Sequence, residues 1–160
     1  ARVLAGEEYG AQRLPAWRAR VTLLAQDAPI LPGDVEHNLS FGFAHRHCRA
    51  GDFESSRARE LMDGVGLDHL DLGRDATTLS GGERHRLALV RGLLFSPTVL
   101  IADEPMSGLD PDSAEMCFEV LLEWAHQSGR AVLAVFHDPA LAARADSRLR
   151  LASGRLEVVA

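Results

Sequence analysis

The stretch TVLIADEP, residues 98 to 105, decides the fold of this chain. Four successive apolar residues, Val99 to Ala102, are typical of a short strand that is covered on both faces. Asp103 and Glu104 follow at its carboxyl end, which is the edge where open α/β sheets hold ligands. Because successive strand residues point to opposite faces, the two acids are expected to have different roles.

Two more apolar runs of strand length end in polar residues. VTLLAQ, residues 21 to 26, ends in Gln26, and AVLAVFH, residues 131 to 137, ends in His137. A helix capped by Asp110 is expected between the acid-bearing strand and the His137 strand. Strands separated by a helix predict a parallel, doubly wound sheet with helices on both faces. We therefore expect Gln26, Glu104 and His137 at the same sheet edge.

The motif LSGGERHR, residues 79 to 86, precedes a predicted helix that ends near Ser96-Pro97. A Ser and two glycines before a helix form a cradle of backbone N–H groups that suits phosphate. The usual phosphate clamp, G-x-x-x-x-G-K-[ST], is absent from the 160 residues, and all 17 cationic residues other than His are Arg. The residues alone predict a phosphate contact without its main clamp.

Turn and cap residues divide the rest of the chain into shorter elements. We expect a strand, a Gly turn and a second short strand within residues 1 to 10, and a short helix capped by Asp34. Further along the chain we expect a mostly helical stretch from 51 to 72 with Gly66 as a stop, a short helix at 139 to 145, and a hairpin turning at Ser153-Gly154.

Composition excludes several classes of protein. A chain of 160 residues with 46% apolar content predicts one compact domain. Its apolar runs are too short to span a membrane, and no signal peptide pattern precedes them, which favours a cytosolic location. The net charge of −6 argues against nucleic-acid binding. Cys48 and Cys117 form no C-x-x-C pair and indicate a reducing compartment, and the cluster His45 to Cys48 is interpreted as a loop rather than a metal site.

Each polar signal has a plain structural explanation when it is taken alone. Asp103-Glu104 is also what an exposed strand end looks like, SGLD at 107 to 110 is also a turn and helix cap, and His137 or Gln26 can simply end a strand. Taken in order, however, Gln26, LSGGE, VLIADEP, SGLD and His137 resemble the Q-loop, signature motif, Walker B, D-loop and switch histidine of ABC-type ATPases.

The resemblance implies a mostly parallel α/β sheet of the P-loop NTPase type with an inserted helical subdomain and with the N-terminal P-loop part missing. It divides the chain into residues 1–27 of the ATP-core lobe, 28–94 of the helical signature subdomain, and 95–160 of the ATP-core lobe with Walker B and the switch His. Two such domains meet head to tail in that family, with ATP between them.

The same resemblance implies a role for each motif residue toward ATP and Mg²⁺. Asp103 and Gln26 would serve Mg²⁺, Glu104 would be the base for the attacking water, and His137 would contact the γ-phosphate. The remaining residues belong to the dimer contact: Ser80, Gly81 and Gly82 would bind ATP held by the partner domain, and Asp110 would couple the two sites. Glu83 and His85 depart from the family pattern, in which Gln is commoner at both positions.

The implied partners are a second, identical ATP-binding domain and a transmembrane permease subunit on the cytosolic face of the cell membrane. Residues 23 to 41 resemble the region that docks on the permease, and the chain looks most like ATP-binding subunits of metal or iron exporters. Walker A is expected upstream of Ala1, on a strand beside those that end in Asp103 and His137. The alternative is a non-catalytic, degenerate domain that regulates a partner and supplies only the signature face.

Overall fold

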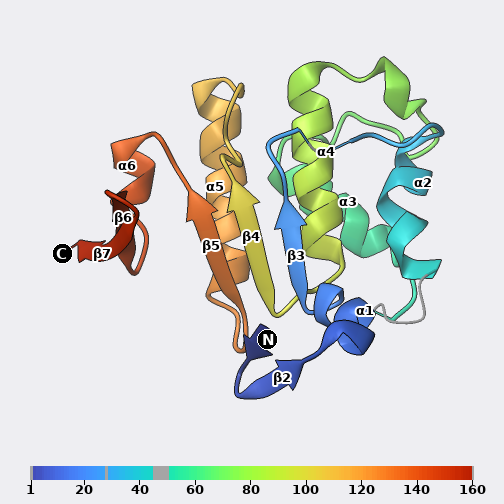
Figure 1. Cartoon of the computed structure of the whole chain (residues 1–160). Helices are drawn as coiled ribbons and strands as arrows, with labels where there is room; N and C mark the ends of the chain where they lie inside the picture. Colours follow the sequence, from blue (N-terminus) through green and yellow to red (C-terminus); the bar gives the residue numbers. More distant parts are fainter. Residues whose placement is uncertain (1, 28, 45–50, 160) are drawn as a thin grey trace.

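A computed structural model describes residues 2–27, 29–44 and 51–159 of the chain. The expectation of a loop at His45 to Cys48 lies outside these residues. The centre of the fold is a parallel sheet of three strands, β3 (Val21–Leu24), β4 (Val99–Asp103) and β5 (Ala131–Val135), in the order β3-β4-β5 (Figure 1). Leu24 pairs with Ala102, and Asp103 pairs with Val135. The parallel α/β fold expected from the sequence is thereby confirmed.

The middle position of β4 corrects one expectation. Both edges of β4 are paired, so no further strand has room beside the strand that ends in Asp103. Among the described residues, the outer edge of β5 carries no strand. The Walker A strand was expected beside both the strand that ends in Asp103 and the strand that ends in His137. The expectation is wrong for the Asp103 strand, because both of its neighbours are already present.

Helices cover one face of this sheet. Helices α4 (Gly81–Leu94) and α5 (Pro111–Ala125) pack against β3 and β5 (Figure 1). The core between helices and sheet buries Leu89, Leu100 and Trp124. On the opposite face, large side chains stay more than half exposed in the described structure: Leu23, Leu133 and Val135. The expectation of helices on both faces is wrong for this part of the chain. An apolar run indicates that a strand can be buried on both faces, but it does not show which elements cover those faces.

The helical part between β3 and β4 is shorter than expected. It comprises α2 (Val35–Ser40), the 3-10 helices η2 (Phe41–Ala44) and η3 (Ala76–Thr78), α3 (Ser55–Gly64) and the start of α4. The expected stop at Gly66 is confirmed: α3 ends at Gly64, and Gly66 follows with a φ of 69°. No helix resumes before Leu72, so the stretch from 51 to 72 is less helical than expected. Leu61, Met62 and Val65, which supplied the apolar pattern, are buried. Leu67, Leu70 and Leu72 are also buried, but from an irregular segment.

The ends of the chain match the expected turns. β1 (Arg2–Leu4) and β2 (Glu7–Tyr9) form an antiparallel pair, followed by η1 (Ala11–Arg13) and α1 (Leu14–Arg18). After β5 come α6 (Pro139–Ala142) and the hairpin of β6 (Arg148–Ala152) and β7 (Arg155–Val159). No helix in the described ranges has the length and apolar content needed to cross a membrane.

Candidate functional site

The carboxyl edge of the sheet brings together three side chains from three strands. The amide Nε2 of Gln26 donates to Glu104 Oε2 at 3.2 Å, and His137 Nε2 lies 2.6 Å from Glu104 Oε1. The register places these residues together because parallel neighbours end at the same edge. Their expected proximity is confirmed, and their chemical roles stay predictions.

Glu104 leaves the strand in an unusual backbone conformation. Its φ is 48°, in the left-handed region that a non-glycine residue rarely occupies, and Ser107 N–H donates to its carbonyl at 3.0 Å to close a turn. Such a conformation costs on the order of 1 kcal/mol and persists only where surrounding contacts hold it. The turn redirects the carboxylate toward Gln26 and His137, so that it no longer follows the alternation expected from the strand.

Asp103 ends β4 and is exposed beside this cluster. Within residues 2–27, 29–44 and 51–159, no three His, Cys, Asp or Glu side chains are grouped so as to hold a metal ion. Mg²⁺ in nucleotide sites takes only one or two protein ligands and completes its shell with water and phosphate oxygens. The exposed carboxylate of Asp103 and the amide oxygen of Gln26 are of the ligand type that this ion takes, and both remain predicted ligands.

The start of α4 is fixed by a reciprocal cap. Ser80 Oγ accepts a hydrogen bond from Glu83 N–H at 3.2 Å, while Glu83 Oε2 accepts one from Ser80 N–H at 2.7 Å. This capping box satisfies two backbone donors that a helix end otherwise leaves open. The exchange holds the backbone of the Ser-Gly-Gly segment in one arrangement.

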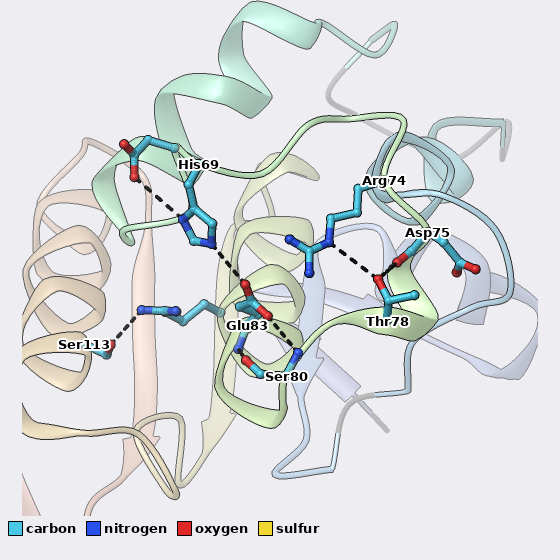
Figure 2. A network of polar contacts seen from close by, with 9 residues as sticks. His69, Arg74, Asp75, Thr78, Ser80, Glu83 and Ser113 are labelled. Carbon is cyan, nitrogen blue, oxygen red and sulfur yellow. Dashed lines mark hydrogen bonds and ion pairs between the residues drawn. The ribbon is translucent and has the colours of Figure 1, made fainter.

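A histidine outside the motif completes this cap. His69 Nε2 lies 3.0 Å from Glu83 Oε1, and the Glu83 side chain is only 14% exposed (Figure 2). The hydrogen bond from His69, followed by that from the Ser80 backbone N–H, lowers the pKa of Glu83 from 4.5 to about 2. Glu83 is therefore a carboxylate at neutral pH, and the departure from Gln places a negatively charged acceptor at the start of α4.

The two glycines of this segment are not required by packing within the chain. A Cβ built on Gly81 meets nothing within 4 Å, and one built on Gly82 first meets Leu109 Cδ2 at 3.7 Å. Neither glycine has a positive φ. Open space over N–H groups at the N-terminus of a 14-residue helix fits an anionic ligand that approaches the backbone closely.

A cleft connects the two regions. It has a volume of about 410 Å³ and is lined from one side by Gln26, Asp27 and Ile30, and from the other by Gly81, Arg84 and His85. The segment after β3 therefore faces the start of α4 within one chain.

Backbone and side-chain bonds fix the position of the segment after β3. Asn38 is fully buried and binds Leu31 twice, because its Oδ1 accepts from Leu31 N–H at 2.8 Å and its Nδ2 donates to the Leu31 carbonyl at 2.9 Å. Val35 N–H donates to the Arg74 carbonyl at 3.0 Å, a few residues before the glycine cradle. Residues 31 to 38 and the residues before Ser80 thus form one connected unit.

Contacts from α4 were missed by reasoning from sequence. Asp110 caps α5 as expected, accepting from Ser113 N–H at 3.0 Å, but Ser113 Oγ also accepts from Arg86 Nη1 at 2.6 Å. His85 Nε2 lies 2.7 Å from the Pro105 carbonyl oxygen. These contacts join residues that are 20 and 27 positions apart, so no local pattern indicates them. For the contact of His85, the one signal in the sequence was that His85 stands where Gln, another side chain with an N–H donor, is commoner.

A parallel sheet with polar residues at its carboxyl edge, beside a capped glycine segment, defines an α/β nucleotide-binding domain. The chain belongs to the ABC transporter family, whose profile matches residues 2–107. The family recognised in the motifs is thereby confirmed.

Relatives and solved structures agree with this assignment. The chain is 44% identical over 103 residues to the lipoprotein-releasing system ATP-binding protein LolD of Shewanella sp. (strain MR-4), covering 64% of this chain and 44% of that protein. It is 47% identical over 100 residues to LolD of Bordetella avium (strain 197N), covering 62% and 43%. The chain therefore spans less than half the length of these relatives.

Two solved structures share the fold. A bacterial Atm1-family ABC exporter with ATP bound matches with a TM-score of 0.70 and 25% identity, over 87% of this chain and 24% of that one. The ATP-binding cassette MJ0796, in a dimeric post-hydrolysis state bound to ADP and Pi, matches with a TM-score of 0.74 and 21% identity, over 97% and 71%.

Proposed function

We propose that the protein containing this chain hydrolyses ATP to drive an ABC transporter. The observation that carries the proposal is the contact of Glu104 with both Gln26 and His137 at the carboxyl edge of the sheet. The family match and the LolD relatives support it. The chain spans 44% of the first relative, so the activity is proposed for the complete protein.

Glu104 is the proposed general base. A carboxylate has about four lone-pair positions, so it accepts one bond from Gln26 and one from His137 and still accepts a proton from water. The water oxygen then attacks the terminal phosphorus of ATP, the bond from phosphorus to the bridging oxygen breaks, and ADP leaves with that electron pair. His137 is the proposed contact to the γ-phosphate, and the 80% exposure of its side chain supports this role. When bound, Mg²⁺ neutralises phosphate charge, and Asp103 with Gln26 would hold it.

We propose that the glycine cradle binds ATP held by a second copy of the domain. The open space over Gly81 and the capped N-terminus of α4 support a phosphate contact there by Ser80, Gly81 and Gly82. The 160 residues contain no Lys that could bind this phosphate. In a head-to-tail homodimer the clamp and the cradle come from different copies, and Asp110 couples the two sites.

The permease and the cargo are proposed from position and relationship. The cleft between Gln26 to Ile30 and the start of α4 is the proposed contact with the transmembrane subunit, on the cytosolic face of the membrane. The relatives named above are described as lipoprotein-releasing, so we propose lipoproteins as the cargo in place of the metal ions first expected.

A non-catalytic role is the second candidate. It applies if the complete protein has no G-x-x-x-x-G-K-[ST] clamp, a motif that the 160 residues do not contain. A domain of this kind supplies the signature face to a partner and hydrolyses no ATP by itself.

Replacing Glu104 by Gln in the complete protein separates these candidates. The amide keeps the shape of the side chain but takes no proton, so we expect turnover to be lost and ATP to hold a closed dimer, detected by ATPase assay and size-exclusion chromatography with ATP. The exposed Glu123 gives the matched control, Glu123→Gln, which should leave both readouts unchanged. Unchanged turnover in Glu104→Gln would exclude Glu104 as the base, and no turnover in the unmodified protein would favour the non-catalytic candidate.

A further inference from the structure

We propose that His85 is a positioning residue for Glu104, acting through the carbonyl of Pro105. This inference rests on the proposed role of Glu104 as the general base. His85 lies on α4, far from β4 in the sequence, yet its Nε2 approaches the Pro105 oxygen to 2.7 Å. It touches the residue directly after Glu104 and not Glu104 itself.

The contact is a directed hydrogen bond. A carbonyl oxygen only accepts, so Nε2 of His85 carries the proton, and the distance is that of a short N–H···O bond. Pro105 is buried and His85 is partly buried, which limits competition from water. The bond therefore fixes the orientation of the peptide plane that follows Pro105.

Glu104 needs such a restraint. Its φ of 48° is unfavourable for any side chain, and a residue that precedes proline is further pushed toward extended conformations. Pro105 has no N–H to donate, and the Glu104 carbonyl accepts a hydrogen bond from Ser107 N–H at 3.0 Å. The hydrogen bond from His85 holds the carbonyl of Pro105, on the side of this residue that faces away from Glu104 along the chain.

A neighbouring contact shows that α4 holds this whole segment. Arg86 Nη1 donates to Ser113 Oγ at 2.6 Å, so successive residues of α4 hold the two sides of residues 105 to 113. A Cβ on Gly82 would lie 3.7 Å from Leu109, so the middle of the segment also packs on α4. The helix that begins at the glycine cradle therefore fixes the backbone next to the proposed base.

We expect this arrangement to depend on the donor and not on the imidazole as such. The Nε2 atoms of His and Gln are the same number of bonds from Cα, so His85→Gln retains an N–H within reach of Pro105. His85→Leu retains bulk but has no donor. The Gln variant should keep the function of His85, and the Leu variant should lose it.

The experiment uses the complete protein with His85→Leu, His85→Gln and the control His126→Leu, which removes an exposed His that pairs with Asp146. Steady-state ATP hydrolysis gives kcat and KM. The ¹⁵N shift of Met106, whose amide shares the peptide plane with the Pro105 carbonyl, reports the hydrogen bond without nucleotide. We expect kcat to fall about tenfold to a hundredfold in His85→Leu with KM little changed, the loss that a small misplacement of a catalytic group causes. The Met106 shift should move in the same variant, and His85→Gln should restore both readouts.

Each contrary result overturns the inference in a different way. Wild-type kcat in His85→Leu, or equal loss in His85→Gln and His85→Leu, would show that the donor does not position Glu104. If His85→Leu does not fold, kcat and the Met106 shift of His85→Gln test the proposal instead. A loss of kcat in His85→Gln without a change in its Met106 shift would overturn the proposal. If the unmodified protein hydrolyses no ATP, the proposed function fails separately, and a Met106 shift that is identical in all three variants overturns the hydrogen bond itself.

Discussion

Replacing Glu83 by Gln should destabilise the protein at neutral pH and less so in acid. The folded chain lowers the pKa of Glu83 from 4.5 to about 2, first through His69 and then through the Ser80 N–H. A lowering of this size corresponds to about 3 kcal/mol in favour of the folded carboxylate. His69 is half exposed and solvent screens the pair, so we take half of that value, about 1.5 kcal/mol, as the loss in Glu83→Gln.

The dependence on pH follows from the direction of the shift. A carboxylate whose folded pKa lies below its unfolded value of 4.5 contributes its full stabilisation above that pH. The contribution is lost as the pH falls through about 2, and at pH 3 about two fifths of it remains. The difference between wild type and Glu83→Gln should therefore shrink from about 1.5 to about 0.6 kcal/mol between pH 7 and pH 3.

Urea unfolding followed by circular dichroism at pH 7 and pH 3 measures this difference. Glu60→Gln is the matched control, because Glu60 pairs with Arg57 at 2.6 Å but its side chain is 69% exposed, and we expect it to cost less than about 0.5 kcal/mol. An equal cost for Glu83→Gln at both pH values would refute the ionic explanation of the cap. A cost no larger than that of Glu60→Gln would refute the assigned magnitude.

Three further predictions concern Asn38, Gly66 and Cys117. Asn38→Ala should cost about 2–4 kcal/mol in urea unfolding, because it leaves buried backbone groups without partners, and a loss below about 1 kcal/mol would contradict this. Gly66→Ala should lower stability more than Gly129→Ala: both have positive φ, at a cost of about 1 kcal/mol, but only a Cβ on Gly66 meets Met116 Cε, at 2.9 Å. Equal losses would show that Met116 moves aside freely. Burial raises the pKa of Cys117 to about 12, so its thiol should resist alkylation at pH 8 until the protein is unfolded, and rapid labelling of the Cys117 peptide in the folded state would exclude that burial.

Much of the fold was predictable because its signals are local. Asp34 and Asp110 cap helices in the structure as expected, since a cap needs only the next three residues. The hairpin at Ser153-Gly154 turns where residues that tolerate a positive φ are placed. The domain boundaries at 28 and 95 stay predictions.

The amino-acid sequence by itself determined most of the elements, the order of the motifs and the family, because these depend on short-range patterns. Only the tertiary structure decided that β4 lies between β3 and β5, since strand order arises from pairing between distant segments. That order brings Gln26 and His137 to opposite oxygens of Glu104, and the packing of α4 brings His85 to Pro105. The left-handed turn at Glu104 opposes the preference of the residue itself, so contacts from the folded chain had to impose it.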